Sequence, residues 1–147
     1  MASKHFFNQV KERFLLSDDE ALLDIPLIHS WLSLEAYWAM GRDIEVVERA
    51  FANSYPIGVY MDGEQVAIAR IVSDTATFAW LCDVFVEKDF RGREIGTWLT
   101  EAVVEWSEKL GITRILLATR DAHDVYSRVG FKVLKNPERW MEIDRRI

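Results

Sequence analysis

Apolar and polar positions alternate with two different periods along this chain. Three segments have a helical period, in which apolar residues recur every three or four positions: 24–34, 43–53 and 95–110. Four segments have the length and apolar content of strands: 12–17, 57–61, 66–72 and 77–86. The last of these is almost continuously apolar, which is typical of a strand buried on both faces at the centre of a sheet.

Turn signals separate these segments. Asp62-Gly63 is a strong hairpin signal between two of the strands, and Gly111 is a fitting C-terminal stop for the helix over 95–110. Four shorter elements are predicted beyond that helix: a strand at 114–118, a helix at 121–128, and strands at 131–134 and 140–143. The predicted order is therefore β-α-α-β-β-β-α-β-α-β-β, a mixed α/β sandwich. No linker rich in Pro, Gly or Ser divides the chain, which favours one domain over residues 1–147.

Composition narrows the class of protein. Half of the 147 residues are hydrophobic and 29% are charged, which is an ordinary globular balance. No apolar run approaches the roughly 18 to 20 residues that would span a bilayer, and residues 1–9 lack the apolar centre of a secretory signal. We therefore expect a cytoplasmic protein with no membrane partner. The single cysteine, Cys82, cannot form an internal disulfide or a cysteine-rich metal site, and we expect no metal.

The net charge of −6 is unevenly distributed. Residues 1–80 carry 6 Lys/Arg and 12 Asp/Glu, whereas residues 81–147 carry 12 of each. A nucleic-acid-binding protein is expected to show a basic surplus, so we expect no nucleic-acid partner. The short basic cluster at 88–93 fits one small anion better than a polymer. The acidic half could attract a cationic partner, or it could simply keep the protein soluble.

The segment 83–96 carries the candidate chemistry, because a strand end runs through a loop rich in Arg and Gly into an amphipathic helix. Helix N-termini present N–H groups without partners and a partial positive charge, which suits a phosphate. Gly92 and Gly96 would let the backbone approach such a ligand closely. Arg91 and Arg93 would add positive charge. An ordinary strand-to-helix turn with solvated arginines would have the same pattern.

Two motifs resemble those of the GNAT acetyltransferase superfamily. The run at 91–96, Arg-Gly-Arg-Glu-Ile-Gly, is similar to the core of that family's motif A, which is Arg/Gln-x-x-Gly-x-Gly/Ala. The run at 122–131, which contains Tyr126 and ends in Gly130-Phe131, resembles the family's motif B. The two motifs lie about 30 residues apart in the proper order. The predicted element order is also that of the family, so the resemblance covers nearly the whole chain.

One position departs from the motif. Glu94 stands where the family has its first motif glycine. A carboxylate would repel a pyrophosphate, and its side chain could block the approach of the ligand to the backbone. We expect the Glu94 side chain to point to solvent and its N–H to stay available, because a residue at a helix N-terminus needs no positive φ.

The resemblance implies an acetyl-CoA-dependent N-acetyltransferase with a GNAT-like fold and splayed central strands. In this family the acceptor amine attacks the thioester directly, and strand backbone equivalent to 84–86 polarises the carbonyl and pairs with the pantetheine arm. The acetyl-CoA-binding residues that follow are Val84, Phe85, Val86, Arg91, Gly92, Arg93, Glu94, Ile95, Gly96 and Thr97. The catalytic candidates are Asp83 and Tyr126, of which Tyr126 matches the usual general acid that protonates the leaving thiolate.

The general base is the least defined of these roles. Some family members have Glu-Asp where this chain has Cys82-Asp83, so the first carboxylate is missing. Asp83 could take the proton of the ammonium, could instead hold structure by accepting backbone hydrogen bonds, or could be replaced by a chain of water molecules. His123 could titrate near neutrality, although its place in a first helical turn favours a surface or capping role. Cys82 lies in an apolar strand and suits a small core residue.

The acceptor site is expected to come from the first two helices and the loop between them. Tyr37 and Trp38 could line an amine pocket with Glu35 attracting a cation, or the two aromatic residues could belong to the core. The acceptor would be a small-molecule amine or a peptide amine. A homodimer is one expected assembly, because dimers are common among similar proteins. Two alternatives stay open: a catalytically weak acyl-CoA-binding sensor, and an interaction protein that kept the fold but lost the cofactor.

Overall fold

A six-stranded sheet forms the centre of the computed structural model, which describes residues 6–146. The strands are β1 (Asn8–Lys11), β2 (Phe14–Ser17), β3 (Tyr55–Met61), β4 (Glu64–Ser73), β5 (Ala79–Val86) and β6 (Ile115–Leu116). They lie side by side in chain order, and every neighbouring pair is antiparallel except β5 and β6, which run parallel. The mixed α/β fold class predicted from the sequence is therefore confirmed.

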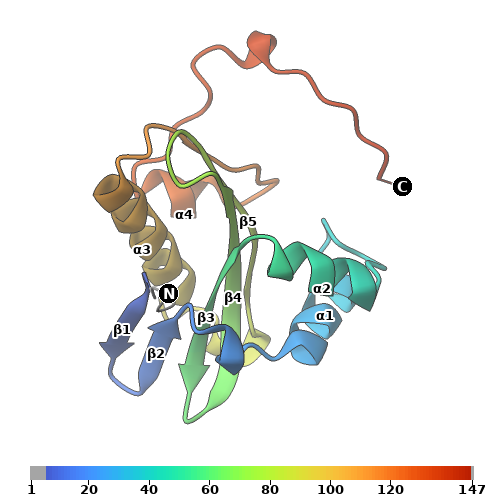
Figure 1. Ribbon diagram of the computed structural model, residues 1–147, viewed down its shortest axis with the longest axis vertical. Helices are drawn as coiled ribbons and strands as arrows, with labels where there is room; N and C mark the ends of the chain where they lie inside the picture. Colours follow the sequence, from blue (N-terminus) through green and yellow to red (C-terminus); the bar gives the residue numbers. More distant parts are fainter. Residues whose placement is uncertain (1–5, 147) are drawn as a thin grey trace.

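Helices cover both faces of this sheet (Figure 1). The helices α1 (Ile25–Leu34) and α2 (Ile44–Ala52) pack on one face, and α3 (Ile95–Leu110) packs on the other. The core is accordingly divided into two clusters. The cluster on the α3 side includes Leu16, Ile57, Ile71, Trp98, Leu99 and Val103, all of them buried. The cluster on the other side includes Ile28, Trp31, Leu32, Phe51, Ile68 and Phe85.

Helix α3 has the boundaries that its apolar spacing predicts. Its large buried residues recur every three or four positions: Ile95, Trp98, Leu99, Val103 and Trp106. Gly111 ends the helix in the left-handed conformation with φ +71°, and its N–H donates to the Glu108 carbonyl at 3.1 Å. This packed stripe fixes the first turn of α3 beside the end of β5.

Strand β5 contains a β-bulge at Asp83, where φ is +50° and the pairing register with β4 shifts. In a regular strand, residues 81 and 85 would point to the same face of the sheet. Instead, Leu81 packs in the cluster beside α3, and Phe85 packs in the cluster beside α1 and α2. The bulge therefore reverses the alternation of side chains between the two faces of the sheet from the middle of β5 onward.

Strands β5 and β6 pair along two residues of each strand. Ala79 pairs with Ile115 and Trp80 with Leu116, after which the described residues show no further pairing between the strands, although β5 continues to Val86. The strand predicted at 114–118 is therefore shorter than expected. The divergence leaves one backbone edge of β5 open, which is the splay of the central strands that the fold class predicts.

The two ends of the chain differ from the prediction. The first predicted strand, 12–17, is part of a hairpin of two strands, β1 and β2, because Glu12 takes a left-handed φ of +56° in the turn. The strands predicted at 131–134 and 140–143 are wrong for the described residues, where this stretch has one short 3₁₀ turn at Pro137–Arg139. A strand needs a neighbour to accept its hydrogen bonds, and this stretch pairs with none of the six described strands.

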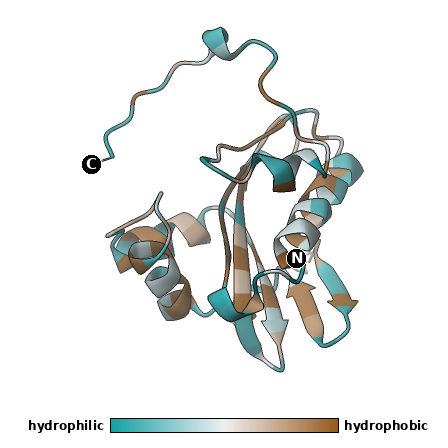
Figure 2. Ribbon diagram, turned by 180° about the vertical axis from the view of Figure 1, so that it is seen from behind, coloured by the Kyte–Doolittle hydropathy of each residue, from teal (hydrophilic) through white to brown (hydrophobic). Residues whose placement is uncertain are grey.

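Residues 131–146, which we name the C-terminal arm, extend away from the sheet and helices (Figure 1). Hydrophobic and hydrophilic residues follow one another along the arm (Figure 2). The exposed fraction is 84% at Val133, 96% at Met141 and 80% at Ile143. Trp140 stacks under the Arg114 guanidinium, whose carbon lies 4.6 Å from the ring centroid. The arm thus exposes apolar side chains that the rest of the described residues do not cover.

Candidate active site

A pocket of about 520 Å³ lies where β5 and β6 diverge. Its walls come from the loop after α1, the middle of β5, the residues that follow β6, and the short helix α4 (His123–Ser127). The candidate residues brought together there are Tyr37, Trp38, Asp83, Val84 and Tyr126. A volume of this size suits a small molecule.

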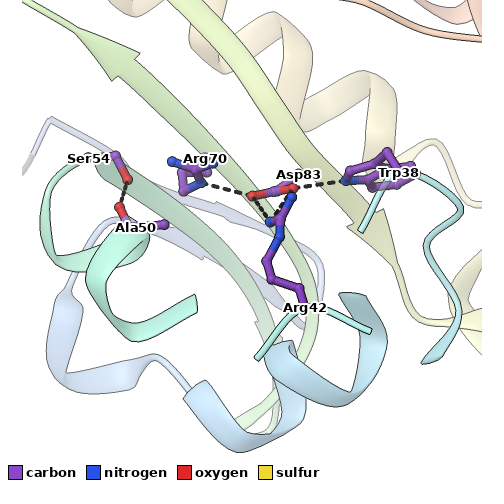
Figure 3. A network of polar contacts seen from close by, with 6 residues as sticks. All are labelled: Trp38, Arg42, Ala50, Ser54, Arg70 and Asp83. Carbon is purple, nitrogen blue, oxygen red and sulfur yellow. Dashed lines mark hydrogen bonds and ion pairs between the residues drawn. The ribbon is translucent and has the colours of Figure 1, made fainter. Parts of the chain in front are cut away.

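Asp83 is the centre of a hydrogen-bond network on this wall (Figure 3). The indole N–H of Trp38 donates to Oδ1 at 2.8 Å, and Arg70 Nε donates to Oδ2 at 2.9 Å. Arg42 Nη1 lies 3.2 Å from Oδ1 and 3.1 Å from Oδ2. The Asp83 side chain is 2% exposed. The network therefore ties the loop between α1 and α2 to the sheet through one buried carboxylate.

Each oxygen of Asp83 already accepts two hydrogen bonds. The partners are side chains, whereas the sequence raised backbone groups as the alternative to a catalytic role. Arg42 and Arg70 were not predicted as site residues at all. A single arginine within the apolar run 66–72 was the available signal, because a charged residue in a buried strand needs a partner.

Tyr126 lies on α4 with its side chain half-buried against the α3-side core. Its ring centroid is 6.0 Å from that of Phe131. Burial, with a smaller effect from the charge of Tyr37, raises the pKa of the Tyr126 phenol above its usual value of 10.0. The phenol therefore stays protonated at neutral pH and can donate a proton. His123, on the same helix, is exposed.

Tyr37 joins the α1–α2 loop to the segment that follows β6. Its hydroxyl accepts a hydrogen bond from the Arg120 N–H at 2.9 Å, and the Arg120 guanidinium carbon lies 3.8 Å from its ring centroid. The Trp38 ring meets Tyr37 edge-on, with centroids 5.0 Å apart. Both aromatic residues line the pocket. Glu35 is exposed at the end of α1 and is not among the lining residues.

The loop between β5 and α3 is built around two arginines. Arg91 Nε donates to the Val86 carbonyl at 2.9 Å, and its guanidinium carbon lies 5.2 Å from the Phe85 ring centroid. The Arg93 guanidinium carbon lies 5.2 Å from the Phe90 ring centroid. These contacts hold positive charge beside the first turn of α3.

Glu94 takes a left-handed conformation, with φ +62° and ψ +18°. The expectation that this position needs no positive φ is therefore wrong. The chain enters α3 through this residue, and the left-handed conformation suits the glycine of the related motif. A residue with a Cβ is less stable in this conformation by about 1–2 kcal/mol. Within the described residues no side chain caps this turn, so the amides of Ile95, Gly96 and Thr97 have no capping partner.

Gly96 leaves open space beside the same amides. A Cβ built on Gly96 would meet a single neighbour within 4 Å, Val86 Cγ2 at 4.0 Å, which is ordinary van der Waals contact. Packing among the described residues therefore does not require glycine at this position. The amides and the space next to them fit a phosphate-bearing ligand, which is the group that the motif implies.

Cys82 lines the pocket with its thiol in the neutral form. Burial raises the pKa of this thiol to about 11, and the Arg70 charge lowers it only in part. A thiol with this pKa is a poor nucleophile at neutral pH, which agrees with a direct transfer that does not pass through a cysteine.

The part of the chain that the structure describes, residues 6–146, lacks two features. This part of the chain has no group of three or more His, Cys, Asp and Glu residues placed to hold a metal ion. Its helices are also too short or too polar to cross a lipid bilayer.

Comparisons with known proteins identify the family of this chain. The profile of the acetyltransferase (GNAT) family matches residues 25–131, which include both motifs and every pocket residue except Arg146. A GNAT-family protein of Xanthomonas campestris pv. campestris, named as a candidate acetyltransferase, is 42% identical with a TM-score of 0.86, covering 92% of this chain and 95% of that one. A Gibberella zeae protein, also named as a candidate acetyltransferase, is 28% identical and covers 85% of this chain and 82% of its own.

A third relative was solved with a ligand. It is a protein of Clostridium acetobutylicum, described as a predicted acetyltransferase and crystallised with acetyl-CoA. It is 18% identical to this chain, covers 89% of it and 94% of its own chain, and superposes with a TM-score of 0.66, so that it shows the shared fold. The family match, the fold and the two motifs together show that this chain belongs to the GNAT acetyltransferase family and is an acyltransferase.

Proposed function

We propose that this protein is an acetyl-CoA-dependent N-acetyltransferase that passes the acetyl group to the amine of a small molecule or peptide by direct attack. The observation that carries the proposal is the uncapped first turn of α3, which lies beside the open edge of β5. We also propose that residues 1–147 act as one N-acetyltransferase domain and that the protein works in the cytoplasm.

Acetyl-CoA would supply the activated thioester, and the chain would hold its two ends at separate places. The loop and helix start formed by Arg91, Gly92, Arg93, Glu94, Ile95, Gly96 and Thr97 would bind the pyrophosphate through backbone amides and two guanidiniums. The open edge of β5 at Val84, Phe85 and Val86 would orient the pantetheine arm, and a backbone N–H there would stabilise the developing oxyanion.

Tyr126 would act as the general acid. It lines the pocket, and its raised pKa keeps the phenol protonated until the leaving thiolate needs a proton. Asp83 was a candidate base, but both of its oxygens are engaged by Trp38, Arg42 and Arg70. We propose that Asp83 chiefly positions the pocket wall, and that water in the pocket carries away the proton of the amine.

The acceptor would enter the pocket between the α1–α2 loop and α4. Tyr37 and Trp38 line it and would contact the acceptor, while Glu35 lies outside. The position of Glu35 does not support the cation-attracting role raised from the sequence.

A homodimer would give the C-terminal arm a partner. The arm exposes Val133, Met141 and Ile143, and β6 is the last strand of the sheet, so that its outer edge is unpaired in the described residues. The arm has five Lys/Arg against three Asp/Glu, whereas residues 1–130 have 13 against 21. We propose that two copies exchange arms, with the basic arm of each copy covering the sheet edge of the acidic partner.

One observation favours a second candidate function, a catalytically weak acyl-CoA-binding sensor. Glu94 brings a negative charge and a strained backbone to the pyrophosphate site. The experiment that separates the two functions combines a thermal-shift titration with acetyl-CoA and an acetyl-transfer assay over a panel of amines. Stabilisation with turnover supports the enzyme, stabilisation without turnover on any amine supports the sensor, and no stabilisation contradicts both.

A further inference from the structure

The pocket carries more positive than negative charge. Its lining has four arginines and two aspartates: Arg42, Arg70, Arg120 and Arg146 against Asp83 and Asp121. The balance is +2 at neutral pH, and it is still +1 without Arg146, which belongs to the arm that would be exchanged in the proposed dimer. The other titratable side chains on its described walls are two tyrosines and the neutral Cys82 thiol. This balance is the opposite of what a site for a purely cationic acceptor would need.

The two arginines at the rim of the pocket, Arg120 and Arg146, which we call the outer arginines, form exposed ion pairs. Arg120 pairs with Asp121 at 3.3 Å, and their side chains are 64% and 65% exposed. Arg146 pairs with Asp144 of the arm at 2.8 Å, also at the surface. Exposed pairs of this kind contribute little to binding or stability. The inner pair, Arg42 and Arg70, therefore decides which ligand the pocket favours.

Arg42 and Arg70 share one carboxylate, so one positive charge is left uncompensated. Arg42 binds Asp83 through Nη1, and Arg70 binds it through Nε. A guanidinium has five N–H donors, and neither arginine has a buried nitrogen without a partner among the described residues, so the unused donors reach solvent. Because the two side chains are only 22% and 15% exposed, an anion there would meet partly desolvated donors.

We propose that the acceptor is a small molecule that carries a carboxylate or phosphate beside its amine, and that Arg42 and Arg70 bind this anion. The inference rests on the proposed acetyl transfer, because it names the acceptor class of the same pocket. The anion would offset the uncompensated charge. The positive surroundings would also favour the neutral amine, which is the nucleophile, over the ammonium.

A positive pocket could instead serve the leaving thiolate of CoA. That effect would be the same for every acceptor, because each reaction releases the same thiolate. Selectivity among acceptors therefore separates the two explanations.

The test uses matched acceptors that differ in their anion. Phosphoethanolamine is compared with ethanolamine, and phenylalanine is compared with phenylalaninamide and phenethylamine; spermidine serves as a polycation. At saturating acetyl-CoA we expect kcat/KM to be at least about tenfold higher for the anionic member of each set. A neutral or polycationic acceptor that equals or exceeds its anionic counterpart would overturn the inference.

Binding to the CoA-saturated protein, measured by calorimetry with the same compounds, keeps the test independent of turnover. Tighter binding of the anionic members without product would support the anion site and contradict the proposed acetyl transfer. Transfer to amines without preference for the anion would support the enzyme and overturn the anion site. Equal binding of all members, with no transfer, would overturn both.

One variant, with a matched control, tests whether Arg42 of the inner pair determines the selectivity for the anionic acceptor. Arg42→Lys keeps the charge but loses the planar donor pair, and should reduce the preference for the anionic over the neutral acceptor about tenfold, through a higher KM for the anionic acceptor. Arg128→Lys, on an exposed residue that donates to the Asp124 carbonyl, is the matched control and should not alter the preference. An equal loss for both acceptors in Arg42→Lys would mean that Arg42 is merely structural.

Discussion

The Trp38 indole N–H donates to Asp83 Oδ1 across 45 positions of sequence, at 2.8 Å. Replacing Asp83 by Asn would keep the shape but leave two part-buried guanidiniums without a counter-charge. We expect the free energy of unfolding to fall by about 3–5 kcal/mol, as for other buried ion pairs that lose one partner.

Trp38→Phe is the matched control, since it removes one hydrogen bond and leaves the charges paired; we expect a loss nearer 1–2 kcal/mol. Denaturant unfolding followed by circular dichroism measures both variants. Equal losses would mean that the indole contact and not the charge balance holds this wall.

Tyr126→Phe tests the general acid. We expect kcat to fall about a hundredfold with the Kd for acetyl-CoA nearly unchanged, because the ring stays in place and only the proton donor is lost. Since burial raises the pKa of this phenol above 10.0, any loss of kcat through its ionisation in the native enzyme should lie on the alkaline side of pH 10. A kcat equal to that of the native enzyme in Tyr126→Phe would remove this residue from the chemistry.

Glu94→Gly should improve both folding and cofactor binding. Glycine adopts the observed φ of +62° without strain, and we expect about 1 kcal/mol of added stability. Removing the carboxylate from a helix N-terminus that binds phosphate should tighten acetyl-CoA binding about two- to fivefold. Glu94→Gln separates the two effects, because it removes the charge and keeps the strain. Thermal unfolding and calorimetry give the two readouts, and weaker binding in both variants would contradict this account.

Gly96→Ala should separate stability from binding. The new methyl group meets only Val86 Cγ2, at 4.0 Å, and alanine is the better helix former, so we expect unchanged stability or a gain of up to about 1 kcal/mol. The same methyl group would occupy the space next to the amides, and the affinity for acetyl-CoA should fall at least about tenfold. Full affinity in a stable variant would place the pyrophosphate elsewhere.

The homodimer is tested by molar mass in solution. Light scattering should give twice the monomer mass, and Met141→Asp should shift the equilibrium toward monomer, because this side chain would be buried against the partner. Val10→Asp, on the 75% exposed Val10 of β1, is the control and should leave the mass unchanged. A monomer at every concentration would show that the arm is not exchanged.

The central elements could be predicted from local pattern because each has its own strong periodicity. Helix α3 is an example, since its apolar stripe and Gly111 fix both ends. The hairpin turn at Glu12 was missed because a glutamate at positive φ gives no sequence signal. The two last strands were predicted from apolar content alone, but a strand also requires a neighbour, and 131–146 pairs with none of the described strands.

The candidate site was predictable where it depends on a motif and not where it depends on distant contacts. The loop at 91–96 and Tyr126 could be proposed as site residues from the sequence because they are consecutive or stand in a recognisable run. Arg42 and Arg70 reach Asp83 from 41 and 13 positions away, which local pattern does not reveal. Glu35 follows the last turn of α1 and is exposed outside the pocket, although Tyr37 and Trp38 line it, and the sequence pattern does not show this difference.

The bulge at Asp83 makes the length of β5 more critical than its composition. Many substitutions would leave the strand's two halves facing their separate cores. A deletion of one residue near the bulge would restore simple alternation and send Phe85 toward the α3 side, rotating every following side chain by half a turn. Insertions and deletions in this strand are therefore far less tolerable than point changes, and this intolerance would be visible in any library that varies both.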